Sequence, residues 1–186
     1  MTIEWDGAGE DVCEVLIGAD EIAARVRTLG QQISHDYAGR ELIVVGVLKG
    51  VLFFMADLLR CMTVPVEVDF LAVSSYTHKE DRQSGVRLLK DLEVSITGRD
   101  VLFVEDMVDT GLTLNYLLRN LRSRQPASLE VCALLNKSKN RLMEIPIRYR
   151  GFDVPDRFVV GYGLDYREQY RNLPFIGVLK GERLSL

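Results

Sequence analysis

Residues 101–114 place the strongest constraint on the fold, because an apolar run there leads directly into acidic side chains and then into Thr-Gly-Leu-Thr. The apolar residues from Val101 to Val104 predict a buried strand of a parallel sheet, since such strands are covered on both faces. The segment that follows carries leucines at helical spacing, namely Leu114, Leu117, Leu118 and Leu121. The predicted order is therefore strand, polar loop and helix, the junction at which open α/β sheets bind ligands.

The polar side chains of this loop suit a phosphorylated sugar. Thr110, Gly111 and Thr113 offer two hydroxyls and an unhindered backbone, which can wrap a phosphate at a helix N-terminus. Glu105 and Asp106 are neighbours on a strand and so point to opposite sides of it, where a diol, a metal ion or both would use them. The alternative is that these acids form only the solvated loop that often follows a strand.

The run from Glu105 to Thr113 resembles the phosphoribosyl-pyrophosphate (PRPP) binding motif of the type I phosphoribosyltransferases, in particular that of the hypoxanthine-guanine branch. The resemblance implies an α/β fold with a central, mostly parallel sheet flanked by helices, a small hood and a mobile loop. It implies that PRPP binds to Glu105, Asp106, Asp109, Thr110, Gly111, Leu112 and Thr113. Leu112 stands where the family commonly has lysine or another residue, but this loop binds mainly through its backbone, so we expect no loss of binding.

The rest of the chain alternates strand-like and helix-like segments up to about residue 135. Strand-like segments, some of them apolar runs and Val66–Val73 partly alternating, are predicted at Leu42–Leu48, Val66–Val73, Val86–Lys90, Val101–Val104, Leu129–Leu135, Phe158–Val160 and Phe175–Leu179. Helical spacing of apolar residues predicts helices between Gly18 and Gly39, at Val51–Leu59 and at Leu114–Leu121. This alternation favours a parallel sheet with right-handed crossovers. We expect one domain over residues 1–186, with its core at about 15–180 and the hood formed by the N-terminal and C-terminal segments.

A second candidate for phosphate binding is Lys49-Gly50, which follows the strand Leu42–Leu48. Lysine supplies a point charge, and glycine lets backbone N–H groups approach a phosphate closely. Taken alone, this pair has a surface turn as its alternative interpretation. In the resemblance it is the pyrophosphate loop, and Arg171 matches an arginine that contacts pyrophosphate.

Residues 74–85 form a long polar stretch without apolar periodicity, which is unusual between the elements of a compact domain. In the resemblance, Ser75 and Tyr76 belong to a mobile lid that closes over the substrates and shields the reacting centre from water. The alternative is a solvent-exposed hairpin loop with solvated charges. Both interpretations can hold, since a lid that is open without substrate would look like such a loop.

Two further segments match the purine-binding parts of the family. Lys137 follows the strand Leu129–Leu135, so its ammonium is expected at the carboxyl edge of the sheet, where the family's lysine meets the 6-oxo group of the purine. Phe158 is implied to stack on the purine ring and Val159 to pair with its edge through the backbone. Asp165 is implied to lie near the exocyclic group and a second magnesium ion. The alternatives are a solvated lysine and a phenylalanine that only packs in the core.

The composition limits the partners. A net charge of −4 and the lack of any basic block argue against binding to nucleic acid. The sequence starts without the pattern of a signal peptide and has no apolar run long enough to span a bilayer, so we expect no membrane association and a cytoplasmic protein. Cys13, Cys61 and Cys132 are too widely separated for a disulfide framework or a zinc knuckle and are expected to be small core residues.

Together these features predict a purine phosphoribosyltransferase that converts hypoxanthine, guanine or both into IMP or GMP and releases pyrophosphate. Mg²⁺ is the implied cofactor, with Glu105, Asp106 and Asp165 as its ligands, and Asp109 is the expected catalytic base. Family members form dimers or tetramers, so a homodimer or homotetramer is expected. Two rivals are an enzyme of the same fold that acts on xanthine or adenine, and a PRPP-sensing regulator, because fold does not decide function.

Overall fold

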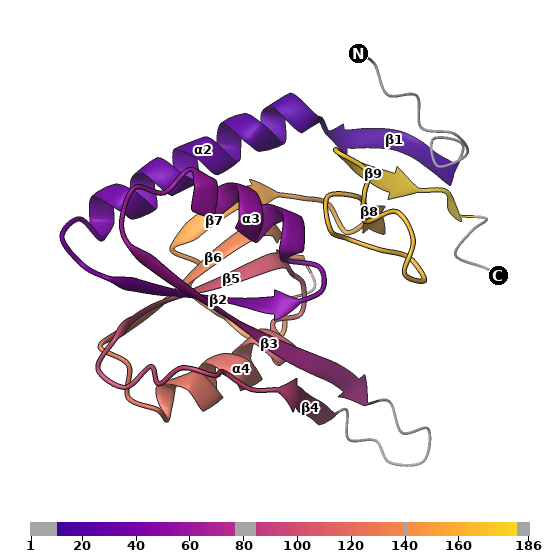
Figure 1. Ribbon diagram of the computed structural model, residues 1–186. Coiled ribbons are helices and arrows are strands. Elements are labelled where there is room, and N and C mark those ends of the chain that lie inside the picture. The colour runs from indigo at the N-terminus through magenta and orange to yellow at the C-terminus, as the bar shows by residue number, and fades with distance from the viewer. Residues whose placement is uncertain (1–10, 77–84, 140, 182–186) are drawn as a thin grey trace.

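The computed structural model describes residues 11–76, 85–139 and 141–181, and its centre is a six-stranded sheet (Figure 1). The strand order is β4-β3-β2-β5-β6-β7, and every neighbouring pair is parallel except β3 and β4. The strands are β2 (Leu42–Leu48), β3 (Val66–Tyr76), β4 (Gly85–Lys90), β5 (Asp100–Val108), β6 (Ser128–Asn136) and β7 (Tyr149–Asp153). The predicted α/β fold with a mostly parallel sheet is confirmed.

Helices cover both faces of this sheet. They are α2 (Ala19–Asp36), α3 (Leu52–Arg60) and α4 (Leu112–Arg122). Figure 1 shows α2 and α3 on one face and α4 on the other. Because side chains alternate along a strand, β5 contributes Leu102 to the core under α2 and α3 and Phe103 to the core under α4. None of the helices in the described ranges combines the length and the apolar character needed to span a bilayer.

A second, three-stranded antiparallel sheet of order β1-β9-β8 forms the predicted hood. Its strands are β1 (Val12–Ile17), β8 (Val159–Val160) and β9 (Ile176–Leu179). β1 pairs with β9, so segments near the two ends of the chain are held together. In Figure 1 this sheet lies on the side toward which the parallel strands point. The division of the chain into a single domain over residues 1–186 stays a prediction.

The sequence analysis missed β1 and β7. Both are edge strands with little burial, and β7 reads Tyr-Arg-Gly-Phe-Asp, which lacks the apolar run of a central strand. Such strands are stabilised by pairing with a neighbour, which is β9 for β1 and β6 for β7, and not by the burial of their own residues. The expectation that all three cysteines are core residues was also wrong. Cys132 in β6 is buried, but Cys61 is partly exposed and Cys13 in β1 is exposed.

Two strands continue further than predicted. β5 extends to Val108 because its last residues pair with the end of β6. Glu105 and Asp106 therefore lie within the strand and not in the loop after it. β3 likewise continues through Ser75 and Tyr76, which pair with the start of β4. A strand whose neighbour offers free backbone groups can thus extend through polar residues, which an apolar pattern does not indicate.

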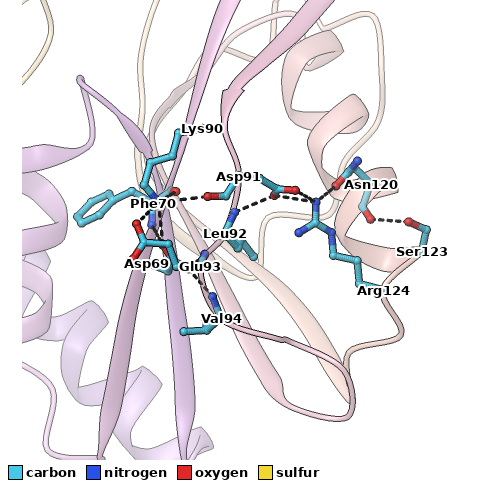
Figure 2. Close-up of polar contacts among 10 residues, drawn as sticks. All are labelled: Asp69, Phe70, Lys90, Asp91, Leu92, Glu93, Val94, Asn120, Ser123 and Arg124. Carbon is cyan, nitrogen blue, oxygen red and sulfur yellow. Dashed lines mark hydrogen bonds and ion pairs between the residues drawn. The ribbon is translucent and has the colours of Figure 1, made fainter.

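Asp69 connects β3 to the segment that follows β4 (Figure 2). Its side chain is only 6% exposed. Its carboxylate accepts hydrogen bonds from the backbone N–H groups of Phe70, Glu93 and Val94 and from the ammonium of Lys90, at 2.7 to 3.2 Å. Burial alone would raise the pKa of Asp69, but these donors favour the charged form and hold the pKa below its ordinary value.

We expect Asp69→Asn to lower the free energy of unfolding at pH 7 by about 2–3 kcal/mol, because an amide cannot accept all these bonds and leaves buried donors unpaired. The lowered folded-state pKa means that this stabilisation is present above the unfolded-state pKa and is lost as the pH falls through the folded-state value. Urea denaturation at several pH values measures both effects. Asp91→Asn is the matched control, because Asp91 is half exposed in its pair with Arg124 and should contribute less than about 1 kcal/mol. Equal losses in the two variants would contradict the special role of Asp69.

Candidate functional site

The central sheet changes its direction of winding between β2 and β5. The chain passes from β2 through α3 to β3 on one side, and from β5 through α4 to β6 on the other. Ligands of open α/β sheets bind outside the carboxyl ends of the strands at such a switch point. Here the two strand ends touch, because a Cβ added at Gly50 would lie 1.7 Å from Oδ2 of Asp106. Only glycine leaves room for that carboxylate.

Glu105 and Asp106 point to opposite faces of β5, as the alternation of a strand predicts. Asp106 faces Gly50, whereas Glu105 lines a pocket on the side of α4. Burial raises the pKa of Asp106 to about 6, an effect opposed by the N–H of Met107 and the charge of Arg171. Burial, followed by the charge of Asp106, raises the pKa of Glu105 well above its ordinary value. Two such carboxylates favour a ligand that brings positive charge or hydrogen-bond donors.

The pocket beside α4 has a volume of about 230 Å³. Its lining includes five of the predicted PRPP-binding residues, namely Glu105, Asp109, Thr110, Gly111 and Thr113. Gly111 precedes α4 with a φ of 81°, a left-handed conformation that favours glycine. Oε2 of Glu105 and Oδ1 of Asp109 are buried without a hydrogen-bond partner in the part of the chain that the structure describes. Leu112 does not line the pocket and is 44% exposed at the start of α4.

Arg141, which the sequence analysis did not identify, holds the loop between β5 and α4 in place. Its Nη2 donates to the carbonyl oxygen of Val108 at 3.2 Å and to the side-chain oxygen of Asn136. The backbone N–H groups of Leu142 and Met143 donate to the carbonyl oxygen of Thr110 at 3.0 and 3.2 Å. The segment therefore connects the end of β5 with the end of β6. No local pattern indicates this role, since Val108 and Arg141 are 33 residues apart in the sequence.

Lys137 lies beside the same loop. Its backbone N–H donates to the carbonyl oxygen of Val108 at 2.9 Å. Its side chain is only 6% exposed, so the alternative of a solvated lysine was wrong. Among the described residues, no hydrogen-bond or ion-pair partner of the ammonium is found. Because its stem is packed and its ammonium carries three donors, Lys137 is well suited to meet an acceptor on a ligand.

The other three predicted purine-binding residues lie in or near the hood. Phe158 is 41% exposed and meets Tyr166 edge to face, with 5.5 Å between the ring centroids. The alternative of simple core packing for Phe158 was therefore wrong. Val159 is buried in β8. Asp165 accepts a hydrogen bond from the backbone N–H of Glu168 at 2.9 Å.

The two predicted pyrophosphate contacts lie in two different loops. Lys49 is in the loop after β2, Arg171 is in the loop between β8 and β9, and both contact Glu168. Oε2 of Glu168 accepts from Nζ of Lys49 at 3.1 Å and from Nη2 of Arg171 at 3.2 Å. Arg171 also pairs with Asp165 at 2.9 Å. A Cβ on Gly163 would lie 2.0 Å from the carbonyl oxygen of Gly50, so the two loops are in direct contact. The sequence analysis did not identify Glu168.

The predicted lid lies mostly outside the described residues, because it includes residues 77–84. Ser75 and Tyr76 are the last residues of β3, and their role as part of a lid stays a prediction.

The predicted magnesium ligands do not form a closed site. Within the ranges that the structure describes, no three acidic, cysteine or histidine side chains lie close enough to hold an ion. Mg²⁺ often takes one or two carboxylates and completes its octahedral shell with oxygens of the substrate and water. Asp106 fits this pattern because Asp165 is near enough to raise its pKa, and Glu105 fits it because its Oε2 is buried and finds no hydrogen-bond partner among the residues described.

Comparison with known proteins places this geometry in a family. The model of the phosphoribosyl transferase domain matches residues 18–167. The hypoxanthine-guanine phosphoribosyltransferase of Mycobacterium tuberculosis is 50% identical over 175 residues, which cover 91% of this chain and 87% of that protein. The chain belongs to the hypoxanthine-guanine phosphoribosyltransferase family.

Other members of the hypoxanthine-guanine phosphoribosyltransferase family agree with this assignment. The Bacillus subtilis enzyme is 46% identical over 170 residues, which cover 91% of this chain and 94% of that protein. A crystal structure of a hypoxanthine phosphoribosyltransferase from Staphylococcus aureus matches with a TM-score of 0.93 at 44% identity, covering 98% of this chain and all of that one. The resemblance inferred from Glu105 to Thr113 is thus confirmed over nearly the whole chain.

Proposed function

We propose that this phosphoribosyltransferase acts in purine salvage, transferring the 5-phosphoribosyl group from PRPP to N9 of hypoxanthine or guanine to give IMP or GMP and pyrophosphate. The pocket at the end of β5 carries this proposal, because one oxygen of Glu105 and one of Asp109 are buried there beside the start of α4 and have no hydrogen-bond partner in the described part of the chain. A helix N-terminus suits a phosphate, and the carboxylates suit the ribose hydroxyls and a developing positive charge.

The reaction needs little covalent help from the protein. Pyrophosphate leaves C1′, positive charge develops on the ribose ring, and N9 of the purine attacks from the opposite face. Glu105 and Asp106 hold the ribose diol, and their negative charge favours the cationic transition state. Asp109 accepts the proton from N7 of the purine as N9 becomes bonded. Glu105, Asp106 and Asp165 would hold magnesium, which would neutralise charge on the pyrophosphate and so make it a better leaving group.

Recognition of a 6-oxopurine is assigned to Lys137. The oxo group accepts a hydrogen bond from the ammonium, whereas the amino group of adenine presents donors to the same place. Phe158 stacks on the purine ring, and its exposed face supports this role. Val159 pairs with the purine edge through its backbone, and Asp165 lies near the exocyclic group.

The proposed partners are the substrates and further copies of the same chain. Leu52 and Phe53 of α3 are 50% and 38% exposed, and they offer an apolar surface for a homodimer or homotetramer. Light scattering after size-exclusion chromatography measures the assembly. A cytoplasmic location, without nucleic-acid or membrane partners, stays part of the proposal.

A spectrophotometric assay with PRPP, magnesium and each of four purines tests the proposed function. We expect turnover with hypoxanthine, guanine or both. Turnover confined to xanthine or adenine would favour the rival enzyme of the same fold. Tight PRPP binding without turnover on any purine would favour a PRPP-sensing regulator.

Arg141→Met is expected to lower kcat/KM for phosphoribosyl transfer by about tenfold, because a misplaced catalytic loop raises the barrier by about 1.4 kcal/mol. The variant removes the hydrogen bonds to Val108 and Asn136 and leaves every proposed substrate contact in place. Arg148→Met is the control, since Arg148 is 46% exposed and pairs with Asp36 and Glu130. Equal kcat/KM in the wild type and Arg141→Met would show that the loop keeps its position without Arg141.

A further inference from the structure

We propose that Glu168 is an internal competitor of pyrophosphate, whose carboxylate holds in the free enzyme the two cations that the pyrophosphate group of PRPP engages. This inference rests on the proposed function, because it takes PRPP as the ligand of the site. It adds to the site a residue that opposes ligand binding and favours release of the product.

The geometry places one carboxylate oxygen between two cations. Oε2 of Glu168 accepts from Lys49 at 3.1 Å and from Arg171 at 3.2 Å. The cations come from separate loops, since Lys49 follows β2 and is 119 residues from Glu168 in the sequence. A phosphate oxygen accepts charge-assisted hydrogen bonds from Lys and Arg in the same way. The carboxylate oxygen therefore makes the contacts that a phosphate oxygen would make with these two cations.

The turn that carries Glu168 fixes its direction. Arg167 and Glu168 have φ values of 53° and 64°, which non-glycine residues adopt rarely and only where the surroundings hold them. Tyr166 and Gln169 exchange two backbone hydrogen bonds across the turn, at 3.0 and 3.2 Å. The N–H of Glu168 donates to Oδ2 of Asp165 at 2.9 Å. The side chain thus projects from a constrained turn toward Lys49.

The contact is weak enough for a substrate to displace. The side chains of Lys49 and Glu168 are 66% and 64% exposed, so water screens their attraction. The hydrogen bonds from Lys49 and then Arg171 lower the pKa of Glu168, which keeps the carboxylate charged at neutral pH. Pyrophosphate carries several negative charges and can engage both cations with separate oxygens. Glu168 therefore lowers the apparent affinity in proportion to the fraction of molecules in which it occupies the cations.

The same competition acts on the product side. After transfer, pyrophosphate is held by Lys49 and Arg171, and Glu168 is the nearby group that can replace it on both. A charged group that returns to the cations favours dissociation of pyrophosphate. Where product release limits turnover, this accelerates the cycle. Glu168 thus weakens the binding of PRPP and speeds the release of pyrophosphate.

Isothermal titration of the full-length enzyme with inorganic pyrophosphate, and separately with PRPP, each with MgCl₂, tests this inference. Glu168→Gln keeps the shape of the side chain and removes its charge. We expect its Kd for both ligands to fall by about three- to tenfold, the range set by one exposed ion pair with Lys49 and one partly buried pair with Arg171. In steady-state assays, KM for PRPP and the inhibition constant of pyrophosphate should fall with it. Glu93→Gln is the matched control, because Glu93 is 77% exposed, pairs with Lys90 and lies outside the site.

Unchanged or weaker binding in Glu168→Gln would overturn the proposal, and weaker binding would assign Glu168 the opposite role of holding the cations in place for the ligand. Thermal unfolding checks that each variant is folded. Glu168→Asp provides a second test, because its shorter side chain cannot bridge both cations, and it should tighten binding in the same direction. A wild type that binds neither ligand and transfers nothing would refute the proposed function as well. A wild type that binds and turns over, with an unchanged Glu168→Gln, would refute this inference alone.

Discussion

Asp109→Asn is expected to retain PRPP binding and to lower turnover by about two to four powers of ten, the usual contribution of a general base. Oδ1 of Asp109 is buried and has no hydrogen-bond partner among the residues that the structure describes, so it is free to take a proton from a substrate. The amide keeps the shape of the loop between β5 and α4 but cannot accept that proton. Titration calorimetry with PRPP and the steady-state rate with hypoxanthine measure the two properties separately.

Asp100→Asn is the matched control for this experiment. Asp100 lies at the opposite end of β5, where it pairs with Arg40 and Ser128. A carboxylate there can affect stability but not proton transfer, so its kcat should stay near that of the wild type. If Asp109→Asn turns over within a factor of about three of the wild type, the proton is taken by another group.

The local pattern of the sequence predicted the centre of this fold correctly. The apolar runs at the centres of β2, β5 and β6 are buried on both faces, so their core residues are nearly all apolar. The leucines of α4 fall on one helical face because only that face meets the sheet. The burial of these elements can therefore be predicted from the pattern of their own residues. β1 and β7 cannot be predicted in this way, since both are edge strands with little burial; β1 is held by β9 from the other end of the chain, and β7 by the preceding strand, β6.

Some residues of the site could likewise be predicted from the sequence, and others could not. Lys49, Asp109 and Lys137 directly follow β2, β5 and β6, and the sequence analysis placed all three after strands of a parallel sheet, so their common edge follows from topology. Glu168 and Arg141 could not be found in that way. Their partners are Lys49 and Val108, which lie far along the chain, and the contacts exist only after folding. An arginine or glutamate in a polar loop has no local signal that separates a bridging role from a solvated one.

Lys137→Gln is expected to lower the preference for hypoxanthine over adenine by about one to two powers of ten, because a hydrogen bond to a charged group contributes about 1.5–3 kcal/mol. The ammonium of Lys137 only donates, so it favours a 6-oxo group and opposes the amino group of adenine. A glutamine amide can donate or accept and therefore distinguishes the two bases poorly. The ratio of kcat/KM for hypoxanthine to kcat/KM for adenine is the measured quantity, since it compares transition-state binding of the two bases.

Lys139→Gln gives the matched control, because it makes the same chemical change two residues away on an exposed side chain. Its ratio should equal that of the wild type. The buried position of Lys137 makes the two outcomes easy to separate: the residue is only 6% exposed and lies beside the loop after β5, whereas Lys139 is exposed, so only the change at Lys137 should appear in the ratio. If the ratio is the same in Lys137→Gln, Lys139→Gln and the wild type, the 6-position of the purine is recognised by another residue.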